Sequence, residues 1–396
     1  MSSKMIKALG LILLISIFFC SGCMFLKPTS SNRMIGVYKE LHHAVLNNDI
    51  QKVQKILNEN SIDLNDENLF TELPLLSSVE KGYATMAEIL VKNGADIRKP
   101  VYKNYRNILE LAVLNNNISM VSKLIKLGFD INAKSYKSGN AMTTAIIHNS
   151  NIEMIKKLVE LGINKSYSNE NDQNYLHFAA KSGSKELYVY FLSILKDDRQ
   201  KTLDNQTALH FAAMSGNLEL FQYLLSRKFN VYEKDLYGKN ALNFASSTDI
   251  LSFLFKNYAF DINQRDYYGS TPLITAFNIA DKDKRKKVVK YLLEKGSDIN
   301  TRSNSGTAAL HNAVFSGDYD LVKMLIDKGA NVNVCDVSNT TPLHLAANTK
   351  NTDEHPRIIK LLLDSGANKL IKDINENTPL DIAVKISNTR IIKLLR

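Results

Sequence analysis

The sequence predicts an all-α protein, a solenoid of about eleven helix-turn-helix units joined by β-hairpin-like fingers. Two features predict this fold. A short element of the form Thr-Pro-Leu-His-x-Ala returns at intervals of about 33 residues, and a second apolar helical segment, often ended by glycine, follows it. The last small residues of the successive copies are Ala44, Ser78, Ala112, Ala145, Ala179, Ala212, Ala245, Ala276, Ala313, Ala346 and Ala383.

Residues 341–366 show how one unit is expected to fold. Thr341 can cap a helix through its hydroxyl, and Pro342 suits the first helical position because its missing N–H is not needed there. The apolar residues that follow form a stripe at helical spacing. A second helix is expected to end at Gly366, since glycine adopts the left-handed cap conformation at low cost. One such pair cannot bury its own apolar face, so stacked units must share a continuous core.

This pattern resembles the ankyrin repeat family, whose signature is a period of about 33 residues with this same element. The resemblance covers residues 38–396. It implies an ankyrin-repeat array and a protein that binds a protein partner and is not an enzyme. Five histidines occupy one position of the repeat, where the family's histidine makes hydrogen bonds between neighbouring units: His42, His177, His210, His311 and His344.

Neither catalytic residues, nor a metal site, nor a cofactor is expected. The repeats occupy nearly the whole chain and leave no segment for a separate catalytic domain. No phosphate-binding glycine loop and no Gly-x-Ser-x-Gly motif is present. His355 is expected in an inserted loop and His148 near a helix end; carboxylates converging on either one would favour an enzyme instead.

The start of the chain differs from the rest. Residues 1–22 combine two early lysines with an apolar run that is too short for a membrane span of about 20 residues, as in a signal peptide. The sequence Ser21-Gly22-Cys23 resembles a bacterial lipobox, and this resemblance implies lipidation of Cys23 and a lipid-anchored linker at 23–37. An ordinary cleaved leader or an uncleaved anchor are the alternatives, because Cys20 stands where an aliphatic residue is usual.

The expected location is therefore the bacterial cell envelope, with the protein lipid-anchored to a membrane and facing the periplasm or the surface. No disulfide framework is expected, because Cys335 has no partner once Cys23 is acylated. The formal net charge of +10 is spread over 396 residues, and the lysines form no single stripe. We therefore expect no nucleic-acid partner, and a monomeric array.

Two groups of residues are candidates for partner binding. Four tyrosines lie in two successive fingers, and tyrosine is enriched in binding hot spots. An insertion between the helices of repeat eight, around 281–286, is strongly basic, and insertions in repeat arrays often form a binding surface. The candidate residues are Tyr232, Tyr237, Tyr267, Tyr268, Lys284, Arg285, Lys286 and Lys287. Packing of the rings along neighbouring fingers, and a solvated extension of a helix start, are the alternatives.

Other tyrosines of the connections are Tyr102, Tyr105, Tyr136 and Tyr167, and repeat ten carries a second insertion around 350–353. The leading functional hypothesis is an interaction scaffold or adaptor that uses the groove and the fingers. The alternative is an inhibitor or immunity-type regulator of an enzyme or toxin. The middle of the array is expected to be its weakest part, because repeats five to seven lack the glycine cap and Lys228 stands at the glycine position of repeat six.

Overall fold

The computed structural model describes residues 30–68, 70, 72–99, 107–134, 139–349 and 354–396, with side chains from residue 35 onward. In these residues the regular elements are helices, and isolated bridges join Ser168 to Asn174 and Arg302 to Ala308. The predicted leader, Cys20 and Cys23, and the insertion at 350–353 lie outside the described residues. So do Tyr102, Tyr105 and Tyr136.

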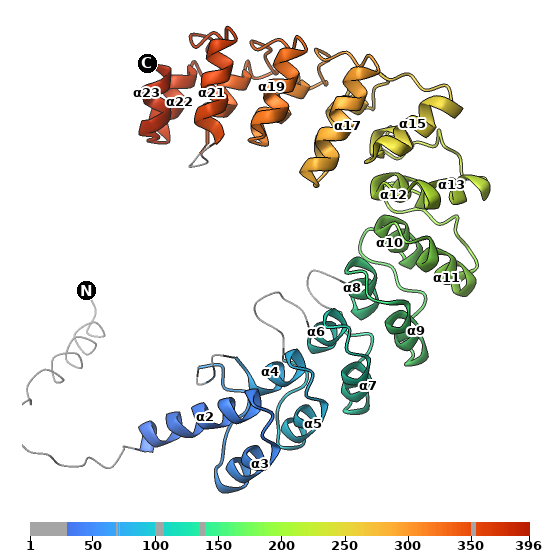
Figure 1. Ribbon diagram of the computed structural model, residues 1–396, viewed down its shortest axis with the longest axis vertical. Helices are drawn as coiled ribbons and strands as arrows, with labels where there is room; N and C mark the ends of the chain where they lie inside the picture. The colour runs from blue at the N-terminus through green and yellow to red at the C-terminus, as the bar shows by residue number, and fades with distance from the viewer. Residues whose placement is uncertain (1–29, 69, 71, 100–106, 135–138, 350–353) are drawn as a thin grey trace, which may run out of the picture.

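The helices alternate between two layers of a C-shaped arch, whose described ends face each other across its open side (Figure 1). The first helices of the units form the inner layer. They are α2 (Ser30–Leu46), α4 (Pro74–Glu80), α6 (Ile108–Leu114), α8 (Ala141–Ile147), α10 (Tyr175–Ser182), α12 (Ala208–Ser215), α14 (Ala241–Phe244), α16 (Pro272–Thr275), α18 (Ala309–Phe315), α20 (Pro342–Ala347) and α22 (Pro379–Lys385).

The second helices form the other layer, which lies on the outer side of the arch from α3 to α13 (Figure 1) and is called the outer layer throughout. They are α3 (Ile50–Glu59), α5 (Ala84–Lys92), α7 (Ile118–Lys126), α9 (Ile152–Glu160), α11 (Lys185–Leu195), α13 (Leu218–Ser226), α15 (Thr248–Asn257), α17 (Lys282–Glu294), α19 (Tyr319–Asp327), α21 (Glu354–Asp364) and α23 (Thr389–Leu395), with a short 3-10 helix, η1 (Ala276–Asn278), after α16. The predicted repeat of helix pairs is confirmed. Helix α2 begins at Ser30, within the segment expected to be a linker.

A single hydrophobic core runs along the array from Tyr38 to Leu395. Inner helices pack on inner helices and outer helices on outer helices, as α10 does on α12 and α11 on α13. The repeated alanines, such as Ala179 and Ala212, are fully buried. A methyl side chain at these positions lets neighbouring inner helices approach closely, and the shared core explains why one unit would not be stable alone.

Four of the five aligned histidines join neighbouring units, as predicted. In repeat five, the backbone N–H of Asn174 donates to Nδ1 of His177, so the proton is on Nε2, which lies 3.1 Å from the carbonyl oxygen of Gln200. The same pair of bonds occurs at His210, His311 and His344. His42 does not follow them: it lies inside α2, and its Nδ1 is buried without a described partner.

The ends of the outer helices follow the predicted pattern of caps. Gly329 and Gly366 adopt φ of 90° and 89°. In repeats five and six, Lys196 and Lys228 take the same left-handed conformation, with φ of 62° and 65°. Lysine pays a steric cost there that glycine does not.

Of the two alternatives for the basic segment around 281–286, the structure shows the extended helix start and not a free loop. Residues from Lys282 onward form the first turn of α17, and the Asp281 side chain caps this helix by accepting a 3.0 Å hydrogen bond from Lys284 N. The carboxylate at this N-cap favours helix over loop because it accepts from a first-turn N–H that has no partner within the helix. His355 likewise lies on α21, where it is buried, and not in a loop.

Candidate functional site

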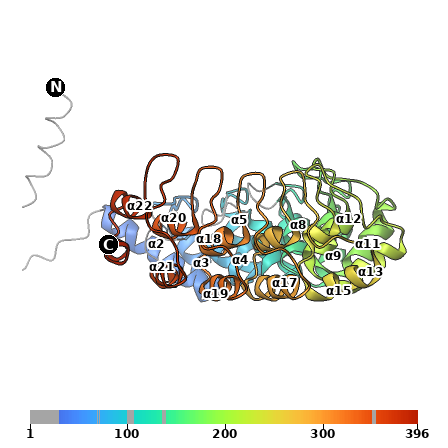
Figure 2. The same cartoon turned by 90° about the horizontal axis from the view of Figure 1, so that it is seen from above.

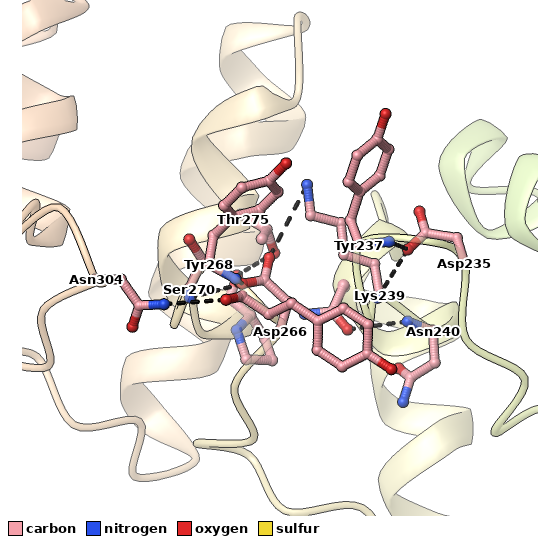
Figure 3. Close-up of polar contacts among 12 residues, drawn as sticks. Asp235, Tyr237, Lys239, Asn240, Asp266, Tyr268, Ser270, Thr275 and Asn304 are labelled. Carbon is pink, nitrogen blue, oxygen red and sulfur yellow. Dashed lines mark hydrogen bonds and ion pairs between the residues drawn. The ribbon is translucent and has the colours of Figure 1, made fainter. Parts of the chain in front are cut away.

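The fingers connect each outer helix to the next inner helix, and they project together from one side of the arch (Figure 2). A buried aspartate closes the finger that leads into repeat seven. One carboxylate oxygen of Asp235 accepts hydrogen bonds of 2.9 Å from the backbone N–H groups of Tyr237 and Lys239. In the next finger, Asp266 accepts from Tyr268 and Ser270 at 2.9 and 2.8 Å (Figure 3). Each aspartate fixes a tight turn that presents the residues after it to solvent.

Hydrogen bonds between successive fingers hold these turns in register. Tyr267 N donates to Tyr237 O at 2.9 Å, and Asn304 N donates to Tyr268 O at 2.8 Å. The same bond recurs on both sides, for example from Leu236 N to Asp204 O at 2.9 Å. Equivalent side chains of neighbouring repeats therefore lie in rows along the finger side of the array.

Tyr237 and Tyr268 form one such pair, as their equivalent positions predict. Their rings stack with centroids 5.8 Å apart and an interplanar angle of 28°. The Tyr237 hydroxyl donates a 2.9 Å hydrogen bond to Asp204, and this bond raises the pKa of the tyrosine. The rings thus pack on each other while the ring of Tyr268 stays exposed. These tyrosines therefore both pack along neighbouring fingers and offer surface to a partner.

Tyr267 lies beside this pair on the same finger. Its ring covers Gly238, where an added Cβ would lie 2.6 Å from Tyr267 Cδ1. Gly238 is needed for a second reason, because its φ of 77° favours glycine. Lys234 places Nζ 5.8 Å from the centroid of the Tyr267 ring. The ring remains 64% exposed and offers a broad apolar face to a partner.

Tyr232 and Tyr167 do not belong to this surface. Tyr232 lies nearer the end of α13, where its ring packs 4.8 Å from the ring of Phe260 and its hydroxyl accepts a 3.2 Å hydrogen bond from Ala259 N. Tyr167 is buried and stacks on Tyr175 at 5.4 Å. The structure therefore brings together three of the four candidate tyrosines.

The basic candidates on α17 have different surroundings from one another. Arg285 is buried, donates a 3.2 Å hydrogen bond to Ile279 O and lies 3.9 Å from the carboxylate of Asp318. A buried guanidinium with these contacts serves the fold and offers little surface to a partner. Lys286 forms a 2.6 Å ion pair with Asp320, whereas Lys284 and Lys287 are exposed.

A larger surface feature was missed by the sequence analysis. In five of the fingers, the residue directly after the aspartate that closes the turn, or after Thr202 at the equivalent place, is an exposed apolar residue. The exposed fractions of these five side chains lie between 59% and 70%. We call these five residues the apolar finger row: Leu203, Leu236, Tyr267, Val337 and Ile374. The signal was present in the sequence, because each of these residues directly follows an Asp or Thr that stands five positions before the Thr or Asn that caps the next inner helix.

Among the described residues, no three His, Cys, Asp or Glu side chains gather as a metal ion would require. Burial lowers the pKa of His177 to about 4, so this imidazole is neutral at physiological pH and its hydrogen bonds are structural. None of the helices in the described part of the chain combines the length and apolar character needed to span a bilayer.

Comparison with known proteins agrees with this fold. Ankyrin repeats, described as a set of three copies, match residues 41–135, 189–266, 228–303, 247–336 and 310–396. A search of curated proteins finds no match. Among solved structures, the ankyrin repeat domain of Bcl-3, described as a unique member of the IkappaB protein family, is 26% identical over 57% of this chain and 100% of its own, with a TM-score of 0.42. The matched segments span well over half of the sequence, and the chain therefore belongs to the ankyrin repeat family.

Proposed function

We propose that this chain is a protein–protein interaction scaffold or adaptor that holds a protein partner against its fingers and the adjoining inner face of the arch. The apolar finger row is the observation that supports the proposal. Its side chains are exposed, and the backbone bonds between fingers fix their spacing. Asn304 occupies the equivalent position between Tyr267 and Val337, so the row consists of two apolar stretches, one on each side of it. Exposed apolar side chains gathered in this way are uncommon on soluble proteins and mark interaction sites.

The geometry also suggests how a partner would be bound. The exposed faces of Tyr267 and Leu236 lie on successive fingers, and lysines such as Lys234 border them. Aromatic and aliphatic residues would supply most of the affinity, whereas the lysines would speed association at low salt. A partner with an apolar patch surrounded by acidic residues would match this surface.

Site-specific photocrosslinking tests the proposal. A photoreactive phenylalanine analogue at position 267 should crosslink a defined protein in cells, and the same analogue at Lys256, exposed on outer helix α15, should not. Replacing Leu236 and Tyr267 together with serine should weaken binding of that protein at least tenfold without changing the thermal unfolding curve. Equal crosslinking from both positions would contradict the proposal.

We also propose that Cys23 carries a lipid that anchors the array to a membrane of the bacterial cell envelope. The support is the sequence Ser21-Gly22-Cys23 after a short apolar run. Labelled fatty acid should enter the wild-type protein and the Cys20→Ser control, and the Cys23→Ser variant should remain unlabelled and leave the membrane fraction. Equal label in the Cys23→Ser variant would refute this anchor.

A further inference from the structure

Two irregularities of the array meet at one place, between repeats seven and eight. Helix α14 has only 4 residues, and Ser247 caps α15 directly after it. Helix α17 is extended at its start and has 13 residues. The shortened α14 leaves space on the inner side of the array, and the segment from η1 to the extended start of α17 forms a wall beside it.

The result is a pocket of about 380 Å³. Its lining is largely apolar and includes Met214, Leu242, Leu251, Pro272, Ile279 and Leu292. Leu242, Leu251 and Leu292 are almost fully buried, whereas Ala280 and Lys284 are exposed. The pocket therefore has an apolar interior and opens to solvent, as binding pockets for apolar side chains do.

Two polar groups in the lining have no hydrogen-bond partner. Asn243 is 8% exposed, and its Oδ1 accepts from Asn240 N at 3.1 Å, but its Nδ2 is buried and unpartnered. Ser246 is 5% exposed, and its hydroxyl is also buried and unpartnered. An unpaired buried polar group is costly and uncommon, so a ligand with hydrogen-bonding atoms would recover that cost.

Asn243 stands where other repeats carry histidine. In those repeats, Nε2 of the ring reaches a carbonyl of the next unit, as His210 reaches Glu233 O at 3.0 Å. The shorter asparagine side chain keeps the first bond, to the N-cap backbone, and its Oδ1 also accepts a 3.4 Å hydrogen bond from Gln264 Nε2 of the next unit, but its Nδ2 donates to no carbonyl there. The substitution thus places a free donor in the lining of this one pocket.

The charge around the pocket favours an anionic occupant. Lys181, Lys239 and Lys284 contribute to its lining, and Asp281 is the only acidic residue among the lining residues. Lys239 is already paired with Asp266 at 3.9 Å, so Lys181 and Lys284 are the lysines that remain for a ligand. The Asp281 carboxylate is already engaged as the N-cap of α17. A carboxylate near the mouth would meet lysines. Other acceptor atoms of the same segment, such as carbonyl oxygens that enter the pocket, would be needed to reach the buried Asn243 Nδ2 and Ser246 hydroxyl.

We propose that this pocket binds one large apolar side chain from an acidic segment of the partner protein. The apolar side chain fills the space left by the shortened α14, and acceptor atoms of the same segment bond to Asn243 and Ser246 while its carboxylates face the lysines. This inference rests on the proposed function, because it assigns an anchor site for the same class of partner, on the inner face and separate from the apolar finger row.

Selection of peptides from a random displayed library on the purified protein tests the inference. The peptides that bind should carry one large apolar residue flanked by Asp or Glu. Ala280→Trp, which blocks the mouth at an exposed position, should weaken their binding at least tenfold, and the matched Ala259→Trp change, which lies outside the lining, should not. Lys181→Glu with Lys284→Glu should weaken binding to a similar extent.

Ser246→Ala distinguishes a binding role from a structural one. It removes an unpartnered hydroxyl, so peptide binding should fall several-fold while the urea midpoint of unfolding stays the same or rises. A lower midpoint with unchanged binding would overturn the inference. Selected peptides that resist Ala280→Trp but are lost with Leu236→Ser and Tyr267→Ser would also overturn it and leave the proposed function standing. Apolar peptides without acidic residues would refute the assigned partner chemistry.

Discussion

Lys228→Gly should stabilise the middle of the array. Lys228 follows α13 with φ of 65°, and its N–H donates to Leu225 O at 2.9 Å. Gly329 occupies the equivalent place after α19, with φ of 90° and the same 2.9 Å bond to Ile326 O. A non-glycine residue pays about 1–2 kcal/mol in this conformation, and glycine loses about 0.5–1 kcal/mol more backbone entropy on folding. The net gain expected for Lys228→Gly is about 1 kcal/mol.

Gly329→Lys is the matched reverse change. A Cβ built at Gly329 meets nothing within 4 Å, so the substitution tests backbone conformation and not a clash. It should lower the free energy of unfolding by about 1 kcal/mol. Urea unfolding curves measure both variants, and hydrogen exchange of the α13 amides locates the effect, because units couple mainly to their neighbours. A destabilising Lys228→Gly, or a neutral Gly329→Lys, would refute the reasoning.

The same reasoning predicts where the wild-type array opens first. Within repeats two to ten, hydrogen exchange should be fastest around residues 195–265. This segment contains Lys228, the short helix α14 and the buried unpartnered groups of Asn243 and Ser246. Uniform protection along the array would contradict the prediction.

Three further changes test individual contacts. Burial lowers the pKa of His177 from 6.5 to about 4, so between these pH values the unfolded chain binds a proton that the folded chain does not bind. The contribution of His177 to the free energy of unfolding, at most about 3 kcal/mol, should be complete above pH 6.5 and lost as the pH falls toward 4. Urea unfolding at a series of pH values measures this, and His177→Gln should reduce the pH dependence. Gly238→Ala should cost about 1–2 kcal/mol and displace Tyr267, whereas Gly94→Ala, where a Cβ meets nothing within 4 Å, should cost less by thermal unfolding. Arg285→Ala should lower stability by about 1–3 kcal/mol, and unchanged stability would restore it as a surface candidate.

The repeat was predictable from sequence because its signals are local and occur many times. Thr341 caps α20 by accepting from His344 N, and Pro342 occupies the first turn, as expected from their residue types alone. The histidine bonds between units followed from position in four of five cases. His42 failed because α2 is a longer helix and places this residue in its interior rather than at a turn.

The candidate site was only partly predictable. The pairing of Tyr237 with Tyr268 followed from their equivalent positions in successive fingers. The roles of Arg285 and Lys286 could not be predicted from their charge. The burial of their side chains depends on where α17 begins, and the Asp281 cap sets that start. Tyr232 was grouped with the finger tyrosines because it is close to them in sequence. It lies five residues before Tyr237, nearer the end of α13, and its ring packs against Phe260 instead.

The pocket shows why a regular array is least predictable where it departs from its own repeat. The short helix α14 and the extended start of α17 each change the length of one repeat by a few residues. Comparing the repeats in sequence detects these length changes but does not show where the altered segments lie in the structure. Because the two changes fall in neighbouring units, residues of both line the same pocket. The regular units set the curvature and the spacing of the fingers, which any member of the family shares. Specificity for one partner must come from what differs between units, and Asn243, Ser246 and the lysines around them are the differences that this structure gathers in one place.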